Sequence, residues 1–234
     1  LTGVIQAVDD YQELLRMSVA SAGNDHRLGA HEAPPAIVSI FLGDELDAIV
    51  DALIDGHEYA SAEKVAMDLG VAVLPNFLID NTDRNRTSPF AFTGNKFEFR
   101  MPGSAVNLSD CNMILNTAMA KSLKDFADAM EGKAGEEFEA AAIDYIRETL
   151  KRHQRIIFNG NGYADEWQEE AARRGLANHR TTADALPCFV APESIELFET
   201  FGVLTETEVR SRYEVKLEKY NKLMNIEART MKRM

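Results

Sequence analysis

The stretch Lys96-Phe97-Glu98-Phe99-Arg100-Met101 alternates ionic and apolar side chains over the length of one strand. Successive side chains of a strand point to opposite faces, so Phe97 and Phe99 are predicted to enter a core while Lys96, Glu98 and Arg100 line the other surface. A carboxylate between two cations suits a divalent metal beside phosphate, because carboxylate oxygens are hard ligands and Arg binds oxyanions through paired hydrogen bonds. Spacing alone, however, favours an ordinary exposed face with mixed charge.

Short apolar runs and longer helical patterns surround this strand. Residues 36–42 and 71–79 are predicted to form two further strands, and the apolar spacing from Val4 to near Ala20 predicts an opening helix,. Further helices are predicted over residues 44–55, 61–69, 109–130, 136–152, 165–174, 194–201 and 206 to the end,. The expected fold class is α+β, mostly helical with a few short antiparallel strands, in two parts: residues 1–108 and residues 109–234.

Composition excludes some classes of partner. The chain has 234 residues, 45% of them hydrophobic and 27% charged, which is ordinary for a globular protein,. A net charge of −13 argues against nucleic acid, because phosphate backbones bind clustered Lys and Arg,. No apolar run approaches the ~18 to 20 residues that span a bilayer, so we expect no membrane partner and a cytoplasmic location. Cys111 and Cys188 stand alone, without the paired spacings of a zinc site or a disulfide framework,.

Two motifs resemble a known enzyme family. The run Asn85-Arg86-Thr87-Ser88, followed by residues 96–103, resembles the late catalytic motifs of glutamine synthetases, in which an Asn-Arg-Ser run precedes a Glu- and Arg-bearing strand. Upstream, Arg27-Leu28-Gly29-Ala30-His31-Glu32-Ala33-Pro34-Pro35 resembles the flap of the same family. The longer strings 20–27 and 156–163 resemble the type III branch. The resemblance therefore covers nearly the whole chain and implies a partial glutamine synthetase catalytic domain.

The resemblance implies a reaction and roles for particular residues. Glutamine synthetases phosphorylate the side-chain carboxylate of glutamate with ATP and then let ammonia displace the phosphate. By this resemblance, Glu98 binds Mg²⁺ or Mn²⁺, and Arg86 meets the phosphate of the nucleotide and stabilises charge in the transition state. Arg100 and Arg27 hold carboxylate and phosphoryl oxygens of the substrate. The resemblance also implies a homo-oligomer.

Two further residues receive roles from the same comparison. Glu32 corresponds to the flap Glu that closes over the site and helps to remove a proton from the incoming ammonium. The interval from Arg27 to Glu32 is one residue shorter than in many type I enzymes, which leaves the pose of Glu32 open. Lys96 corresponds to a basic position near the nucleotide, and residues 43–83 form an insertion that many shorter members lack.

The sequence leaves other possibilities open. Leu1 is not an initiator Met, and the last helix runs on without Gly or Pro, so the chain is expected to be a piece of something longer,. The family's other metal ligands lie N-terminal to this stretch, and one carboxylate does not complete a Mg²⁺ site. The isolated chain is therefore expected to be inactive. The alternatives are a ligase that joins glutamate to another amine and a helical interaction module derived from the enzyme.

Overall fold

Helices dominate the computed structural model, which describes residues 1–30, 32–57, 59, 66–67, 77–78 and 87–233. The helices are α1 (Thr2–Asp10), α2 (Gln12–Ser18), α3 (Ala22–Asp25), α4 (Asp44–Asp55), α5 (Leu108–Met130), α6 (Gly135–His153), α7 (Asp165–Arg173), α8 (Thr182–Ala185), α9 (Pro192–Thr200) and α10 (Glu206–Met231), with 3₁₀ turns η1 (Gln154–Ile156) and η2 (Leu186–Val190). Among these described residues, no helix combines the length and apolar character that crossing a membrane requires,.

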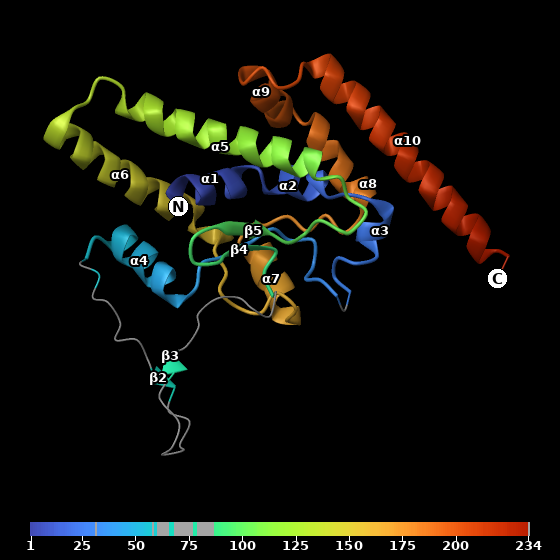
Figure 1. Cartoon of the computed structure of the whole chain (residues 1–234), viewed down its shortest axis with the longest axis horizontal. Coiled ribbons are helices and arrows are strands. Elements are labelled where there is room, and N and C mark those ends of the chain that lie inside the picture. The colour runs from blue at the N-terminus through green and yellow to red at the C-terminus, as the bar shows by residue number, and fades with distance from the viewer. Residues whose placement is uncertain (31, 58, 60–65, 68–76, 79–86, 234) are drawn as a thin grey trace.

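A small sheet lies beneath the N-terminal helices (Figure 1). Its strands are β1 (Ile40–Phe41), β4 (Phe90–Phe92) and β5 (Phe97–Phe99), in the order β1-β4-β5. β1 runs parallel to β4, and β4 runs antiparallel to β5. Two further short strands, β2 (Ala66–Met67) and β3 (Phe77–Leu78), pair antiparallel with each other.

The long helix α5 lies across α1 and α2, and α6 returns beside α1 (Figure 1). Fully buried Ile5 of α1, Leu15 of α2 and Ile114 of α5 belong to one core with the sheet residue Ile40. This core gives the N-terminal helices their stability, because burying a large aliphatic side chain contributes about 1.5 to 3 kcal/mol. The division at residue 108 stays a prediction.

The α+β class and the main helices are confirmed, but three details differ from expectation. The sheet is mixed, since the long connection between β1 and β4 permits a parallel pair,. The opening helix breaks at Tyr11, where the Gln12 side chain donates to the carbonyl of Asp9,. A helix over residues 61–69 is wrong at Ala66–Met67, which pair with another strand; its other residues lie outside those described.

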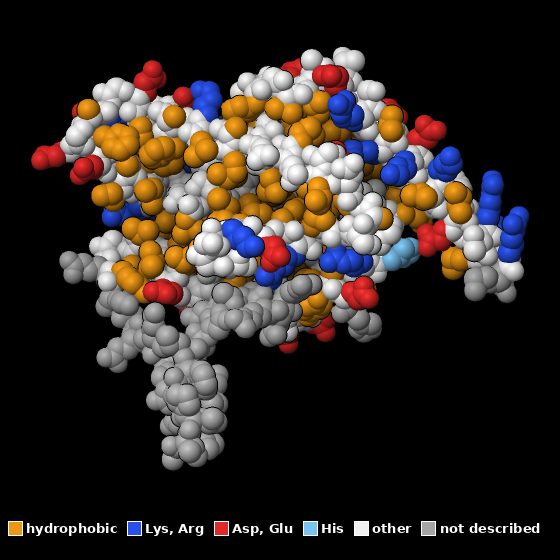
Figure 2. Space-filling model, in the orientation of Figure 1, with side chains coloured by type: hydrophobic (Ala, Val, Ile, Leu, Met, Phe, Trp, Pro, Cys, Tyr) orange, Lys and Arg blue, Asp and Glu red, His pale blue; other side chains and the backbone are white. Residues whose placement is uncertain are grey.

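The aromatic residues of β5 are only half-buried. Phe97 and Phe99 were expected to enter a core, and they do pack beside the ring of Phe90 at centroid distances of 5.4 and 5.8 Å. Both residues line an apolar cavity of about 230 Å³ together with residues of α1, α2 and α5. Figure 2 shows an apolar band on this face of the molecule. The alternation of β5 is confirmed, because Glu98 lies on the exposed side.

The start of α10 offers a direct test of helix capping. The Thr205 hydroxyl accepts a hydrogen bond from Glu208 N (3.3 Å), and Glu208 Oε2 accepts one from Thr205 N (2.9 Å), so the two residues form a capping box,. Thr205→Ala is expected to lower the free energy of unfolding by about 1 kcal/mol in urea melts. Thr230→Ala, near the exposed end of the same helix, should change it by less than about 0.5 kcal/mol. Equal losses would contradict the capping role.

Candidate functional site

A pocket of about 290 Å³ lies between the loop after α3 and the end of β5. Arg27, Glu32, Glu98 and Arg100 all line it, together with the buried Ser88. The sequence separates these residues by up to 73 positions, so the fold brings together four of the residues singled out above. Figure 2 shows cationic and anionic side chains side by side on the face over β4 and β5.

Glu98 and Arg100 form an ion pair at the mouth of this pocket. Arg100 Nε donates to Glu98 Oε2 at 2.9 Å. The Arg100 side chain is 13% exposed and that of Glu98 is 51% exposed. The pair therefore presents a carboxylate to solvent beside a guanidinium that the protein largely covers, and both residues line the pocket.

Arg27 fixes the loop to the strand end. Its Nη1 donates to the carbonyl of Met101 (3.0 Å) and to Asn24 Oδ1 (3.2 Å), and its Nη2 donates to the carbonyl of Arg100 (3.3 Å). Buried Asn24 also donates to Met101 O, at 3.1 Å. These contacts hold the backbone of Arg100 in place, so Arg27 positions the neighbouring cation while also lining the pocket.

The loop that carries Glu32 closes on itself. Gly29, at φ 78°, donates to the carbonyls of Ala33 (3.2 Å) and Pro34 (2.9 Å), a positive φ that a residue with a Cβ rarely adopts,. Glu32 projects from this closed loop and is exposed. The loop thus has a fixed base and carries an exposed carboxylate that lines the pocket.

One expected site residue, Lys96, lies away from the pocket, and another, Arg86, lies outside the described residues. Lys96 is exposed in the turn between β4 and β5, where its carbonyl accepts from Thr93 N at 2.8 Å, and it does not line the cavity. Arg86 lies outside the described residues, as does much of the insertion 43–83 beyond α4. The roles expected for both side chains stay predictions.

Gly162 packs against the backbone just before β4. Gly162 N donates to Thr87 O at 3.1 Å, and a Cβ added to Gly162 would lie 2.2 Å from that oxygen. Gly162→Ala is therefore expected to displace the segment at Thr87 and to lower the free energy of unfolding by about 2 kcal/mol in urea melts. Gly23→Ala, where an added Cβ would meet no atom within 4 Å beyond its chain neighbours and its own helix, should cause no loss. An unchanged Gly162→Ala midpoint would contradict this packing.

Two clusters of titratable side chains were not predicted. Asp9, Asp10 and His153 form the first, and Glu13, His179 and Cys188 form the second. The members of the second are 166 and 9 positions apart, so no local motif marks them. Burial, followed by the hydrogen bond to Glu13, raises the pKa of the Cys188 thiol to about 12,. Burial also raises the pKa of Asp10.

Comparison with known proteins shows relatives along the whole chain. Residues 141–234 match the model of the glutamine synthetase C-terminal domain. A glutamine synthetase from Butyrivibrio fibrisolvens is 47% identical over 234 residues, a type-3 glutamine synthetase from Dictyostelium discoideum 46% over 233, and a glutamine synthetase from Bacteroides fragilis (strain YCH46) 42% over 236. These alignments cover 99–100% of this chain but only 32–33% of each relative. The chain thus spans about a third of the length of the curated relatives it matches.

Proposed function

Because this chain belongs to the glutamine synthetase family, we propose that it supplies part of the site for ATP-dependent ligation of ammonia to glutamate through a γ-glutamyl phosphate. The observation that carries this proposal is the pocket shared by Arg27, Glu32, Glu98 and Arg100. The complete activity belongs to a protein with the full length of the relatives.

Each of these side chains has a task that its surroundings support. Arg100, largely covered and held through its backbone by Arg27, is suited to grip an oxyanion of glutamate or of the moving phosphoryl group,. Exposed Glu32 extends from a closed loop, so it is suited to accept a proton from ammonium and to shield the acyl phosphate from water,. Arg86 is proposed to stabilise phosphate charge, and Lys96 to act near the nucleotide.

The donor set fits a divalent cation in part. Glu98 offers a half-exposed hard carboxylate in the pocket, and Glu32 is a second carboxylate on its lining. Mg²⁺ and Mn²⁺ favour about six oxygen ligands, so further ligands must come from water, from phosphate or from other parts of the full protein. When bound, such an ion would neutralise phosphate charge during transfer. We therefore propose Mg²⁺ or Mn²⁺ at Glu98, with ATP as the nucleotide.

Thermal melting of the 234-residue chain tests the nucleotide role. With Mg-ATP at a concentration equal to its Kd, the melting temperature should rise by about 1 °C, and more at higher concentrations. Glu98→Ala should abolish this shift, whereas Glu139→Ala, at an exposed glutamate of α6, should keep it. No shift in any variant would instead favour the helical interaction module.

The isolated chain is expected to form no glutamine, because one or two carboxylates leave the metal site incomplete.

A second candidate function is association between copies. α10 exposes several large apolar side chains, which include Val215 at 63%, Ile226 at 52% and Met231 at 70%. Exposed apolar surface on a long helix favours contact with another protein surface. We propose that this helix contributes to the homo-oligomer of the full protein. Ile226→Glu should then lower the oligomer mass seen by sedimentation.

A further inference from the structure

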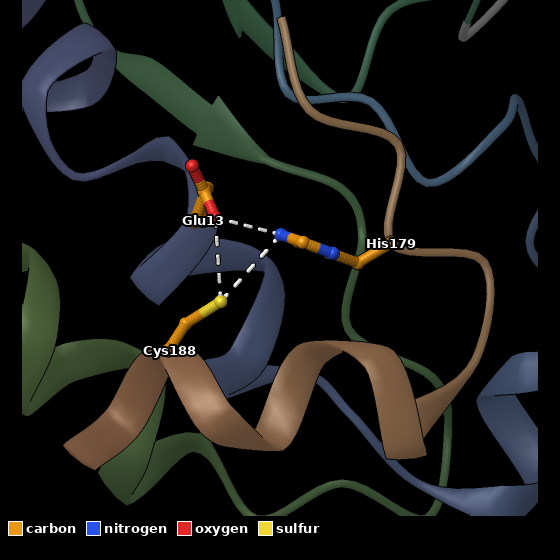
Figure 3. A group of neighbouring side chains, drawn as sticks. All are labelled: Glu13, His179 and Cys188. Atoms are coloured by element: carbon orange, nitrogen blue, oxygen red, sulfur yellow. Dashed lines mark hydrogen bonds and ion pairs between the residues drawn. The ribbon is translucent and has the colours of Figure 1, made fainter. Parts of the chain in front are cut away.

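Three side chains with different ligand chemistry converge on one point beside α2. We propose that Glu13, His179 and Cys188 form a binding site for a transition-metal ion of the zinc class. Figure 3 shows the three side chains reaching toward one another from three separate segments: α2, the connection before α8, and η2. A carboxylate, an imidazole and a thiol are together the donor types that zinc takes in proteins.

The distances between the donor atoms are close to those around a tetrahedral ion. Cys188 Sγ lies 3.4 Å from Glu13 Oε2 and 3.5 Å from His179 Nε2, and Glu13 Oε2 lies 2.8 Å from His179 Nε2. Around tetrahedral zinc, the two sulfur edges would measure about 3.5 Å and the nitrogen–oxygen edge about 3.3 Å. Only the last edge has to open, by about 0.5 Å, which the 54% exposed Glu13 side chain allows through rotation of its own bonds,.

The backbone behind two of the donors is already fixed. Buried Arg16 donates through Nε to the carbonyl of His179 at 2.8 Å, and Ser194 Oγ donates to the carbonyl of Cys188 at 2.7 Å. Glu13 lies within the regular helix α2. A metal ion would therefore meet ligands whose main chain needs little rearrangement, which favours binding because less conformational freedom is lost.

The site also has room for a fourth ligand. Glu13, His179 and Cys188 line a cavity of about 530 Å³ that also contains Tyr11 and Glu193. Three protein ligands with an open fourth position are typical of zinc sites that hold water or an exchangeable group. On binding, the Cys188 thiol gives its proton to solvent and the thiolate sulfur donates an electron pair to the ion. No oxidation or reduction is involved.

The other cluster is a poorer candidate. Both oxygens of Asp9 already accept from Arg155 Nε, at 2.9 and 3.1 Å, and Asp9 Oδ2 lies 2.8 Å from His153 Nδ1. A metal there would have to displace a buried ion pair, and the cluster offers no sulfur ligand. Soft or borderline ions favour thiolate together with imidazole, and this cluster supplies one imidazole with carboxylates only,. The Glu13 cluster is therefore the one to test.

The alternative at the same place is a hydrogen-bonded network without metal, in which a neutral thiol donates to Glu13. Metal titration of the tag-free 234-residue chain separates the two. We expect Zn²⁺ to bind one to one in competition with a chromophoric chelator, and Co²⁺ to produce a thiolate-to-metal charge-transfer band in the near ultraviolet. At a 100-fold excess of Zn²⁺ over its Kd, the melting temperature should rise by about 5 to 10 °C.

Variants locate the binding to these residues. Cys188→Ser should remove the cobalt band and weaken Zn²⁺ binding by about 100-fold or more. Mutation of residues that only hydrogen-bond to metal ligands already lowers metal affinity by about 10- to 100-fold, and Cys188 is a ligand itself. Glu13→Gln, at a side chain too exposed to be needed for folding, should weaken binding at least about tenfold. The controls Cys111→Ala and Asp10→Asn should bind as the unmodified chain does. Absence of the cobalt band in the unmodified chain, or its survival in Cys188→Ser, would overturn the proposal.

Discussion

Glu98→Ala is expected to lower kcat for glutamine formation by about 100- to 1,000-fold in a full-length enzyme that contains this chain. Glu98 is the one carboxylate on the exposed face of β5, and its oxygen lies 2.9 Å from Arg100 Nε. Its removal takes away the proposed metal ligand and the ion pair between Glu98 and Arg100. The measurement is glutamine formed from glutamate, ammonia and Mg-ATP, with phosphate release followed in parallel.

The controls for this result come from the same hairpin. Asn95→Ala changes an exposed residue of the turn three positions away that does not line the pocket, and should leave kcat nearly unchanged because Asn95 has no role in the proposed site. Varying Mg²⁺ adds a second reading, since Glu98→Gln should raise the metal concentration needed for half-maximal activity. If Glu98→Ala kept full activity at low Mg²⁺, the metal role proposed for β5 would be wrong.

The sequence predicted the helices well because their signals are local. The apolar spacing of residues 44–55 and the Thr205–Glu208 capping box depend on neighbours within a few positions, and the structure has both,. The parallel pairing of β1 with β4 could not be read in the same way. It depends on a partner strand 50 positions away, which no local pattern encodes,.

The same difference between local and long-range signals applies to the pocket at Glu98 and to the cluster at Glu13. The alternation in β5 predicted that Glu98 and Arg100 share one face, and the resemblance to a known flap added Arg27 and Glu32. The sequence could not indicate that the Arg27 guanidinium donates three hydrogen bonds, to Asn24 and to the carbonyls of Arg100 and Met101. Nor could the spacing of Cys188 reveal Glu13 as its neighbour, because folding alone brings α2 against η2.

Asp9→Asn is expected to lower the free energy of unfolding of the 234-residue chain by about 3 kcal/mol, because removing one partner of a buried ion pair leaves the others uncompensated. Asp9 is 3% exposed and accepts from Arg155 while contacting His153 Nδ1 at 2.8 Å. It thereby ties α1 to the end of α6 and to η1. We place the loss at the lower end of the usual range because the Arg155 side chain is 43% exposed and water can solvate it,.

Neighbouring Asp10 supplies the matched control for that measurement. Its carboxylate lies 3.7 Å from His153 Nδ1 but is 44% exposed, and burial of its remaining surface raises its pKa, so the charged form is mildly disfavoured in the folded protein,. Asp10→Asn should therefore change the free energy of unfolding by less than about 0.5 kcal/mol at pH 7. Urea melts of both variants decide the matter. If Asp9→Asn and Asp10→Asn unfolded at the same midpoint, the buried network would not hold α1 against α6, and core residues such as Ile5 and Leu150 would have to account for that packing alone.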